Sequence, residues 1–281
     1  MSAAILGLVS ALVYGSADFV GGLAARAIGP LRTTALGAAG GLALLLAALP
    51  FAGGVWSPAA LGWGAASGAV GALAIALLYA CLAIGPMSIL SPLTALVSAV
   101  VPMVWGLAGG DRFAPIGYVA LGLALVAVVL VGFVPERGAV RPSPRALGMA
   151  VAAGALIGVF LIMLNQTPAD SGLVPLVANR TVNAAIMWTI IGVLAARGVT
   201  RRLTRRGLLL GLGSGLLDAS ANVLILLGLR AGDLTTMSVL VALYPAGTIV
   251  LAAVVLRERI APVQWVGLVL AITAAALLAI A

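Results

Sequence analysis

Histidine and lysine are absent from this 281-residue chain, and cysteine occurs once, at Cys81. Metal sites and imidazole-based catalytic sites draw mainly on His, Cys and carboxylate side chains. With only seven acidic residues, a site of either kind is hard to assemble, and a single thiol cannot close an internal disulfide. We therefore expect no catalytic residue, no metal ligand and no cofactor.

Charge is also scarce, and this fixes the class of protein. Charged residues make up 8% of the chain and hydrophobic residues 63%, whereas soluble domains carry about 25% charged residues. The mean hydropathy of +1.26 requires lipid as the solvent. Only helices and closed barrels span bilayers, and barrel strands would alternate polar and apolar residues. The apolar runs here are about 20 residues long without such alternation, which predicts an all-α integral membrane protein.

Ten segments are predicted to cross the membrane. They are residues 3–25, 31–52, 58–83, 86–108, 114–134, 146–167, 173–196, 207–230, 233–256 and 261–281. The longest polar connection, 135–145, is rich in Pro and Arg and is the expected linker on the cytoplasmic side. It separates a first unit, 1–134, from a second unit, 146–281.

The second unit repeats the first. Gly64–Leu130 aligns without a gap on Gly211–Leu277, so that Asp111-Arg112 meets Glu258-Arg259 and Ala114-Pro115 meets Ala261-Pro262. Five spans per unit is an odd number, so the second unit enters the membrane from the opposite side. The sequence thus predicts two inverted five-helix repeats, a typical build of secondary transporters, which hold substrate between the repeats.

Arginine is distributed unequally between the two sides of the predicted bundle. Connections that follow odd-numbered spans carry most of the arginines, and the other connections carry Arg112 and Arg230. The positive-inside rule places the Arg-rich side in the cytoplasm and both termini outside. We read the net charge of +8 as this topology signal, and we expect no nucleic-acid partner because no basic patch is interleaved with aromatic residues.

Charges inside spans are costly and are candidate functional residues by default. Asp218 lies near the middle of span 207–230 and shares a helical face with Gly215 and Asn222. Arg180 shares a face with Asn183 in span 173–196. Arg180 could pair with Asp218 or Asp170, or it could bind an anionic substrate. The structural alternative is that its side chain snorkels to the membrane interface.

Asp18 is the third charge inside a span, four residues after Tyr14 in span 3–25. It could line a substrate site, or it could be an interfacial carboxylate paired with Arg26. Asp218 also has a structural alternative, a buried carboxylate hydrogen-bonded to neighbouring helices.

Hydroxyl and aromatic side chains complete the candidate cavity. Helical spacing groups Ser91, Thr94 and Ser98 in one span. In the span that corresponds to it by the repeat, it groups Ser238, Pro245 and Thr248, with Tyr244 adjacent. Such hydroxyls can line a polar cavity, but more often they bond to their own helix carbonyls. Tyr79 could stack on a flat substrate, or simply pack.

Three short motifs stand out together: Tyr14-Gly15-Ser16 with Asp18-Phe19, Leu256-Arg257-Glu258-Arg259-Ile260, and Gln264-Trp265-Val266-Gly267. In these motifs the chain resembles the EamA-type permeases of the drug/metabolite transporter superfamily. The first unit departs from the pattern at Gly110-Asp111-Arg112. The resemblance implies a ten-helix inverted-repeat carrier with a central cavity lined mainly by helices 1, 3, 4, 6, 8 and 9, and alternating access that often exports amino acids or other small metabolites.

Two classes of function follow. The first is a multi-pass secondary transporter in the plasma (inner) membrane that exports a small metabolite such as an amino acid. Its expected partners are the substrate, the bilayer and protons as a coupling ion, and we expect a monomer or homodimer. The alternative is an integral-membrane enzyme or lipid-handling protein, but such enzymes usually cluster His, Asp or Glu near one interface. A channel is a weaker third class, because no ring of like charges is evident.

Overall fold

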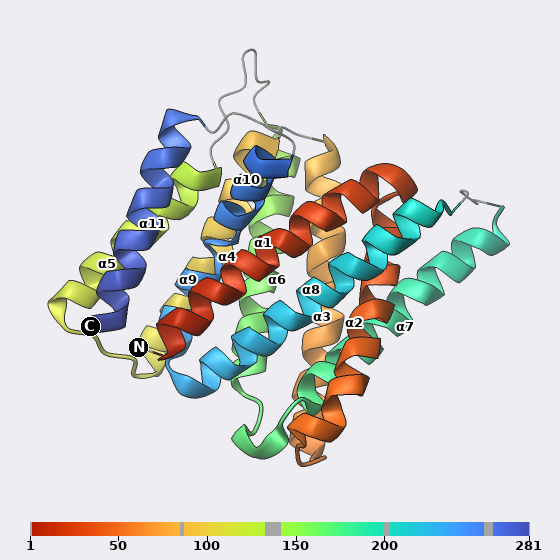
Figure 1. Ribbon diagram of the computed structural model, residues 1–281, viewed down its shortest axis with the longest axis horizontal. Coiled ribbons are helices and arrows are strands. Elements are labelled where there is room, and N and C mark those ends of the chain that lie inside the picture. Colours follow the sequence, from red (N-terminus) through yellow and green to blue (C-terminus); the bar gives the residue numbers. More distant parts are fainter. Residues whose placement is uncertain (1, 85–86, 133–141, 199–202, 256–260, 281) are drawn as a thin grey trace.

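The computed structural model (Figure 1) describes residues 2–84, 87–132, 142–198, 203–255 and 261–280. Within these ranges the chain forms α-helices and one short 3-10 turn, and no strand. The helices are α1 (Ser2–Ile28), α2 (Pro30–Ala52), α3 (Pro58–Ile84), α4 (Met87–Gly109), α5 (Pro115–Gly132), α6 (Pro144–Asn165), η1 (Ala169–Ser171), α7 (Val174–Ala196), α8 (Arg205–Ala231), α9 (Leu234–Val241), α10 (Tyr244–Val255) and α11 (Pro262–Ile280). The predicted all-α fold is confirmed.

Helix length and composition fit a membrane protein. Among the described residues, six helices are long and apolar enough to cross a bilayer, and four shorter apolar stretches lie in α4, in α5, across α9 and α10, and in α11. Every predicted span overlaps a helix, but the ninth, 233–256, consists of two helices rather than one. The interruption falls at Ala242 and Leu243.

Proline explains this interruption. Pro245 has no N–H, so the carbonyl of Val241 cannot receive the usual hydrogen bond from four residues ahead. The N–H of Leu243 bonds instead to the carbonyl of Leu240, and that of Ala246 to the carbonyl of Leu243. These tighter bonds turn the chain between the end of α9 and Tyr244, where α10 begins.

Glycine allows the central helices to touch. A Cβ on Gly215 of α8 would fall on the backbone of Gly37 in α2, and a Cβ on Gly68 of α3 would fall on the backbone of Asn179 in α7. Small residues give membrane helices this close approach, which raises van der Waals contact where lipid provides no hydrophobic drive for association.

The helix contacts follow a pattern that survives exchange of the two halves. By the repeat, α1, α2 and α3 correspond to α6, α7 and α8. The contact of α1 with α8 therefore corresponds to that of α6 with α3, and the contact of α2 with α8 corresponds to that of α7 with α3. The helices that close each half, α5 and α11, pack against each other. Figure 1 also shows the two termini near one another at the same end of the molecule.

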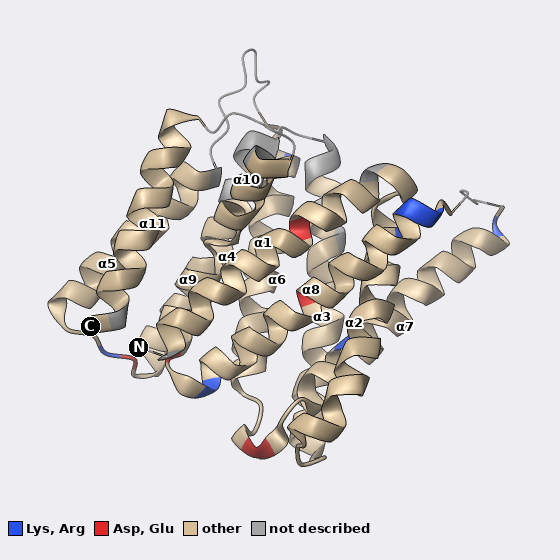
Figure 2. Cartoon of the chain, viewed as in Figure 1, with Lys and Arg blue, Asp and Glu red and all other residues tan. Residues whose placement is uncertain are grey.

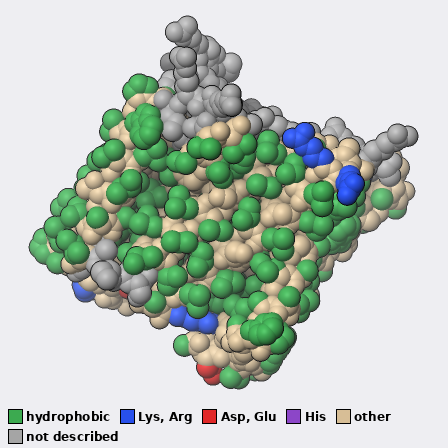
Figure 3. Space-filling model, in the orientation of Figure 1, with side chains coloured by type: hydrophobic (Ala, Val, Ile, Leu, Met, Phe, Trp, Pro, Cys, Tyr) green, Lys and Arg blue, Asp and Glu red, His purple; other side chains and the backbone are tan. Residues whose placement is uncertain are grey.

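The outer surface is apolar. Hydrophobic side chains cover the face in Figure 3 between the two ends of the molecule, and Leu12, Val104 and Trp105 are more than half exposed. Trp105 therefore lies on this outer surface and not in the wall of a central cavity. Figure 2 shows charges mainly at the helix ends. Such a surface fits lipid and not water.

Candidate functional site

A cavity of about 190 Å³ lies at the centre of the bundle. Its walls come from α1, α2, α3, α4, α6, α7, α8 and α9, together with Ala242 and Tyr244 where α10 begins. Helices α2 and α7 thus join the set implied by the resemblance. Nine candidate residues line this cavity: Tyr14, Asp18, Ser98, Arg180, Asn183, Asp218, Asn222, Ser238 and Tyr244.

Arg180 and Asp218 form an ion pair across the wall. The Arg180 Nη2 donates to the Asp218 Oδ2, and the two side chains are 11% and 25% exposed. The pair bridges α7 and α8 past Gly41 of α2, where a Cβ would lie 3.6 Å from the Arg180 Nε and 3.0 Å from the carbonyl of Gly215. Of the alternatives left open for Arg180, the structure selects Asp218 over Asp170 and over snorkelling.

The asparagines of α7 and α8 differ in how well they are satisfied. The Asn179 Nδ2 donates to the Ser67 Oγ of α3 at 2.8 Å, and the Asn222 Nδ2 donates to the backbone carbonyl of Asp218 at 2.8 Å. The Oδ1 atoms of Asn183 and Asn222 are buried and have no hydrogen-bond partner. An unsatisfied buried acceptor costs about 1–3 kcal/mol, so two of them beside one cavity indicate a place where a donor is to be supplied.

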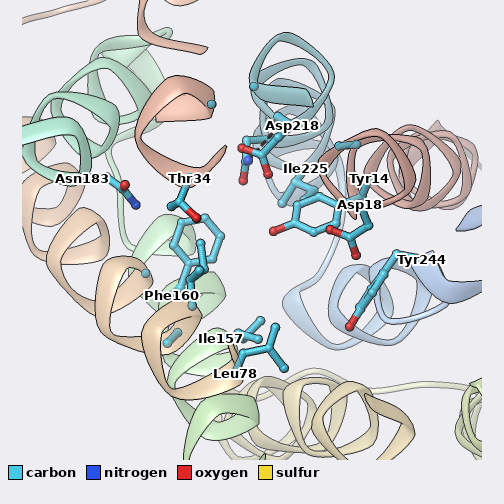
Figure 4. Close-up of a pocket in the computed structure, with 18 of the residues that line it drawn as sticks. Tyr14, Asp18, Thr34, Leu78, Ile157, Phe160, Asn183, Asp218, Ile225 and Tyr244 are labelled. Atoms are coloured by element: carbon cyan, nitrogen blue, oxygen red, sulfur yellow. Dashed lines mark hydrogen bonds between the residues drawn. The ribbon is translucent and has the colours of Figure 1, made fainter. Parts of the chain in front are cut away.

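Tyr14, Asp18 and Tyr244 form a second polar wall (Figure 4). The rings of Tyr14 and Tyr244 lie 5.6 Å apart at 59°. They meet because α1 and α10 touch at Gly15 and Gly247, whose missing side chains leave room for the two backbones. The hydroxyl of Thr248 then donates to the carbonyl of Gly15 at 3.1 Å.

Asp18 is exposed to the cavity. Among the described residues, none donates a hydrogen bond to its carboxylate or forms an ion pair with it. The alternative partner Arg26 has a side chain outside the described part of the structure, so that pairing is untested.

An apolar wall faces these polar groups. Leu78 of α3 and Ile157 and Phe160 of α6 lie across the cavity from Asp18 and Tyr244 in Figure 4. These residues were not predicted from sequence, because an apolar side chain in an apolar span carries no distinguishing signal. Thr33 and Thr34 of α2 also line the cavity and were missed, although each donates to a carbonyl of the preceding turn.

Thr94 does not line the cavity, and that prediction is wrong. Its hydroxyl is buried between α4 and α6, within hydrogen-bond distance of the carbonyls of Leu90 and Ala150. Ser98 and Ser238 do line the cavity, but their hydroxyls donate to the carbonyls of Ala95 and Thr235 in their own helices. The side chains of Tyr79 and Ser91 lie outside the described residues.

Hydrogen bonds between separate elements tie together the end of the bundle that carries both termini. The Asp111 Oδ2 accepts from the Thr235 hydroxyl at 2.6 Å and from the Thr235 N–H at 3.2 Å, which joins the α4–α5 turn to the start of α9. The Arg230 Nη2 donates to the Ser171 Oγ at 3.0 Å and to the Gly172 carbonyl at 2.9 Å. This end is therefore fastened by bonds between segments distant in sequence.

Comparison with known proteins finds a family match for the second half of the chain. Residues 144–280 match the EamA-like transporter family, so the resemblance to EamA-type permeases is confirmed there. No curated protein matches the chain. Twenty-seven chains of solved structures do. One of them, described only as the crystal structure of a protein, has a TM-score of 0.77 at 17% identity and covers 99% of this chain and 98% of its own. At that identity the likeness is one of fold alone.

Proposed function

We propose that this chain, whose residues 144–280 match the EamA-like transporter family, is a secondary transporter that moves a small metabolite through its central cavity. The observation that carries the proposal is the cavity itself. Asp18, Arg180 and Asp218 converge on one space inside a bundle whose other charges lie mainly at the helix ends. Ionisable groups at membrane depth typically mark a substrate or ion path.

Inverted repeats would give such a carrier its two states. The exchange-symmetric contacts support this arrangement, since α1 with α8 corresponds to α3 with α6 when the halves are swapped. A pseudo-twofold axis through the cavity would make the two ends of the molecule alternative gates, opened in turn by rocking one unit against the other.

The end with both termini is the closed gate in this proposal. Asp111 and Arg230 hold that end together through Thr235 and the 171–172 segment. The cavity wall reaches Thr33, three residues into α2 from its start at the opposite end. With the Arg-rich end in the cytoplasm, the conformation would accept substrate from inside, as an exporter in the plasma membrane requires. Protons are the proposed coupling ion, and the oligomeric state is that of a monomer or homodimer.

An integral-membrane enzyme or lipid-handling protein is the other class to test. The match to a family of transporters favours the transporter class. The exposed apolar surface is compatible with both classes, because either protein would contact lipid.

Transport in proteoliposomes separates the two classes. A thermal-shift screen of amino acids, nucleosides and small amines first selects a ligand, and solute counterflow of that ligand is then measured with and without a proton gradient. The proposal expects saturable counterflow that Asp218→Asn abolishes. Asp233→Asn should keep the wild-type rate, because Asp233 lies outside the cavity and an asparagine can also cap α9 there. Chemical conversion of the ligand without counterflow would show an enzyme instead.

A further inference from the structure

We infer that the substrate is a small organic cation, with an ammonium group on an apolar body, and that the Asp18 carboxylate binds the ammonium group. This rests on the transporter function proposed above and narrows it. Three features of the cavity carry the inference: an unbalanced charge, a pair of aromatic rings and unpaired acceptors.

The charges that line the cavity do not cancel. Asp218 neutralises Arg180 through their ion pair, which leaves the carboxylate of Asp18 with no cationic partner in the described part of the chain. Asp18 lines the cavity and is also the one of the three with more than a third of its surface exposed. A ligand anion would meet this carboxylate unfavourably, while a ligand cation would balance it.

Two tyrosines stand beside this carboxylate. Tyr14 and Tyr244 lie next to Asp18 in Figure 4, with ring centroids 5.6 Å apart. The faces of aromatic rings attract ammonium groups, and aromatic side chains grouped around one point are a recurring means of binding them. Carboxylate and aromatic faces together therefore favour an ammonium over an uncharged hydroxyl of similar size.

The unpaired polar atoms on the other wall are acceptors. The amide orientation of Asn222 is fixed, because its Nδ2 donates to the carbonyl of Asp218, and a carbonyl can only accept. Its Oδ1 is thus the atom without a partner, in a residue that is 3% exposed and lines the cavity. An ammonium supplies up to three N–H donors, whereas a carboxylate or phosphate supplies none.

The remaining wall and the cavity volume determine the polarity and size of the uncharged part of the ligand. Leu78, Ile157 and Phe160 offer an apolar surface opposite Asp18. The volume of about 190 Å³ is below the roughly 300–1,000 Å³ of sites for drug-sized ligands. A primary amine of one aromatic ring or a short aliphatic chain is the size that fits.

Three probes that share a phenylethyl body and differ in head group test this. They are 2-phenylethylammonium, 2-phenylethanol and 3-phenylpropionate, titrated calorimetrically at neutral pH into the purified full-length protein in detergent. We expect the cation to bind at least tenfold more tightly than the other two. Asp18→Asn should weaken binding of the cation at least tenfold and leave binding of the alcohol within twofold, and Asp18→Glu should retain most of the affinity. The control Asp233→Asn, outside the cavity, should change neither.

Three results would overturn the inference: tighter binding of the anion, cation affinity unchanged in Asp18→Asn, or no binding of any probe. If Asp18→Asn does not fold, the head-group order in the wild type and the Asp18→Glu titration still decide. Counterflow of radiolabelled 2-phenylethylamine keeps the two proposals apart. Amine binding without counterflow would count against the transporter function and support the ligand class. Counterflow of another solute without amine binding would support the transporter function and overturn the ligand class.

Discussion

Arg180 of α7 donates a hydrogen bond to Asp218 of α8 at the wall of the central cavity. The two residues are far apart in sequence and each lies inside a membrane-spanning helix. Each charge can remain at that depth because the other is present, since an isolated charge in a bilayer is costly. The pair therefore links the packing of two helices to the electrostatics of the cavity.

Removing one partner of this pair should be worse than removing both. Arg180→Met and Asp218→Leu should each lower the melting temperature in detergent, because each leaves one charge uncompensated, and the double variant should recover part of the loss. The cost of each single change should stay below the about 3–5 kcal/mol of a fully buried pair, since Asp218 is 25% exposed. Arg205→Met, at an exposed helix start, is the matched control. Strictly additive losses would show that the two side chains do not stabilise each other.

Some of this site could be predicted from sequence and some could not. Asp18, Arg180, Asp218 and Asn222 stood out because polar groups are expensive in lipid. The choice of Asp218 as the partner of Arg180 depends on how closely α2 and α8 approach, and glycine spacing allows that approach without specifying it.

The errors have equally specific causes. Thr94 carries a hydroxyl on the expected face, but a hydroxyl can be satisfied by backbone carbonyls, and here it bonds between α4 and α6. Phe160 is one apolar residue among many, so nothing in the sequence set it apart. The ninth span was predicted as one helix, but Pro245 lies inside it and the structure has two. The helix is interrupted there because the N–H groups of Leu243 and Ala246 each bond to the carbonyl three residues back.

The contact between α2 and α8 should tolerate no side chain on the Gly215 face. Gly215→Ala would place a Cβ on the backbone of Gly37, and neither backbone can move without shifting a helix. We expect a lower melting temperature and reduced yield. Gly213→Ala is two residues away on the same helix and has open space around its Cβ position, so it should be neutral or stabilising by up to about 0.5–1 kcal/mol, as expected for Gly→Ala in a helix. Equal melting temperatures for the two variants would contradict the close helix contact.

The orientation of the bundle can be measured with two matched cysteines. Ser57 and Ser143 lie at opposite ends of the bundle and play the same local role, since each hydroxyl accepts from an N–H in the first turn of α3 or α6. Their replacement by Cys should therefore cost similar stability, about 1 kcal/mol. On a Cys81→Ala background, a membrane-impermeant maleimide added to intact cells should label Ser57→Cys and spare Ser143→Cys. The reverse pattern would invert the orientation and leave the fold intact.

The bonds at the terminal end of the molecule should control access to the cavity from that side. Arg230 reaches from the end of α8 to Ser171 and Gly172, and its loss would release the 169–172 segment from α8. Arg230→Met should raise the rate at which an impermeant thiol reagent, applied from outside, modifies Ser238→Cys in the cavity wall, by severalfold or more. Arg112→Met is the matched control, because Arg112 lies at the same end but bonds only to the carbonyls of Leu107 and Asp111 within its own turn. Its labelling rate should equal that of Ser238→Cys alone.

The same experiment distinguishes a gate from a general loosening of the fold. If Arg230→Met merely destabilises the protein, reagent access should rise equally in inside-out vesicles, and the melting temperature should fall in proportion. A gate predicts the opposite change on the two sides, since opening one end of an alternating-access carrier closes the other. Faster labelling from outside together with slower labelling in inside-out vesicles would therefore identify the Arg230 bonds as part of the closed state. Equal acceleration on both sides would reduce them to structural ties.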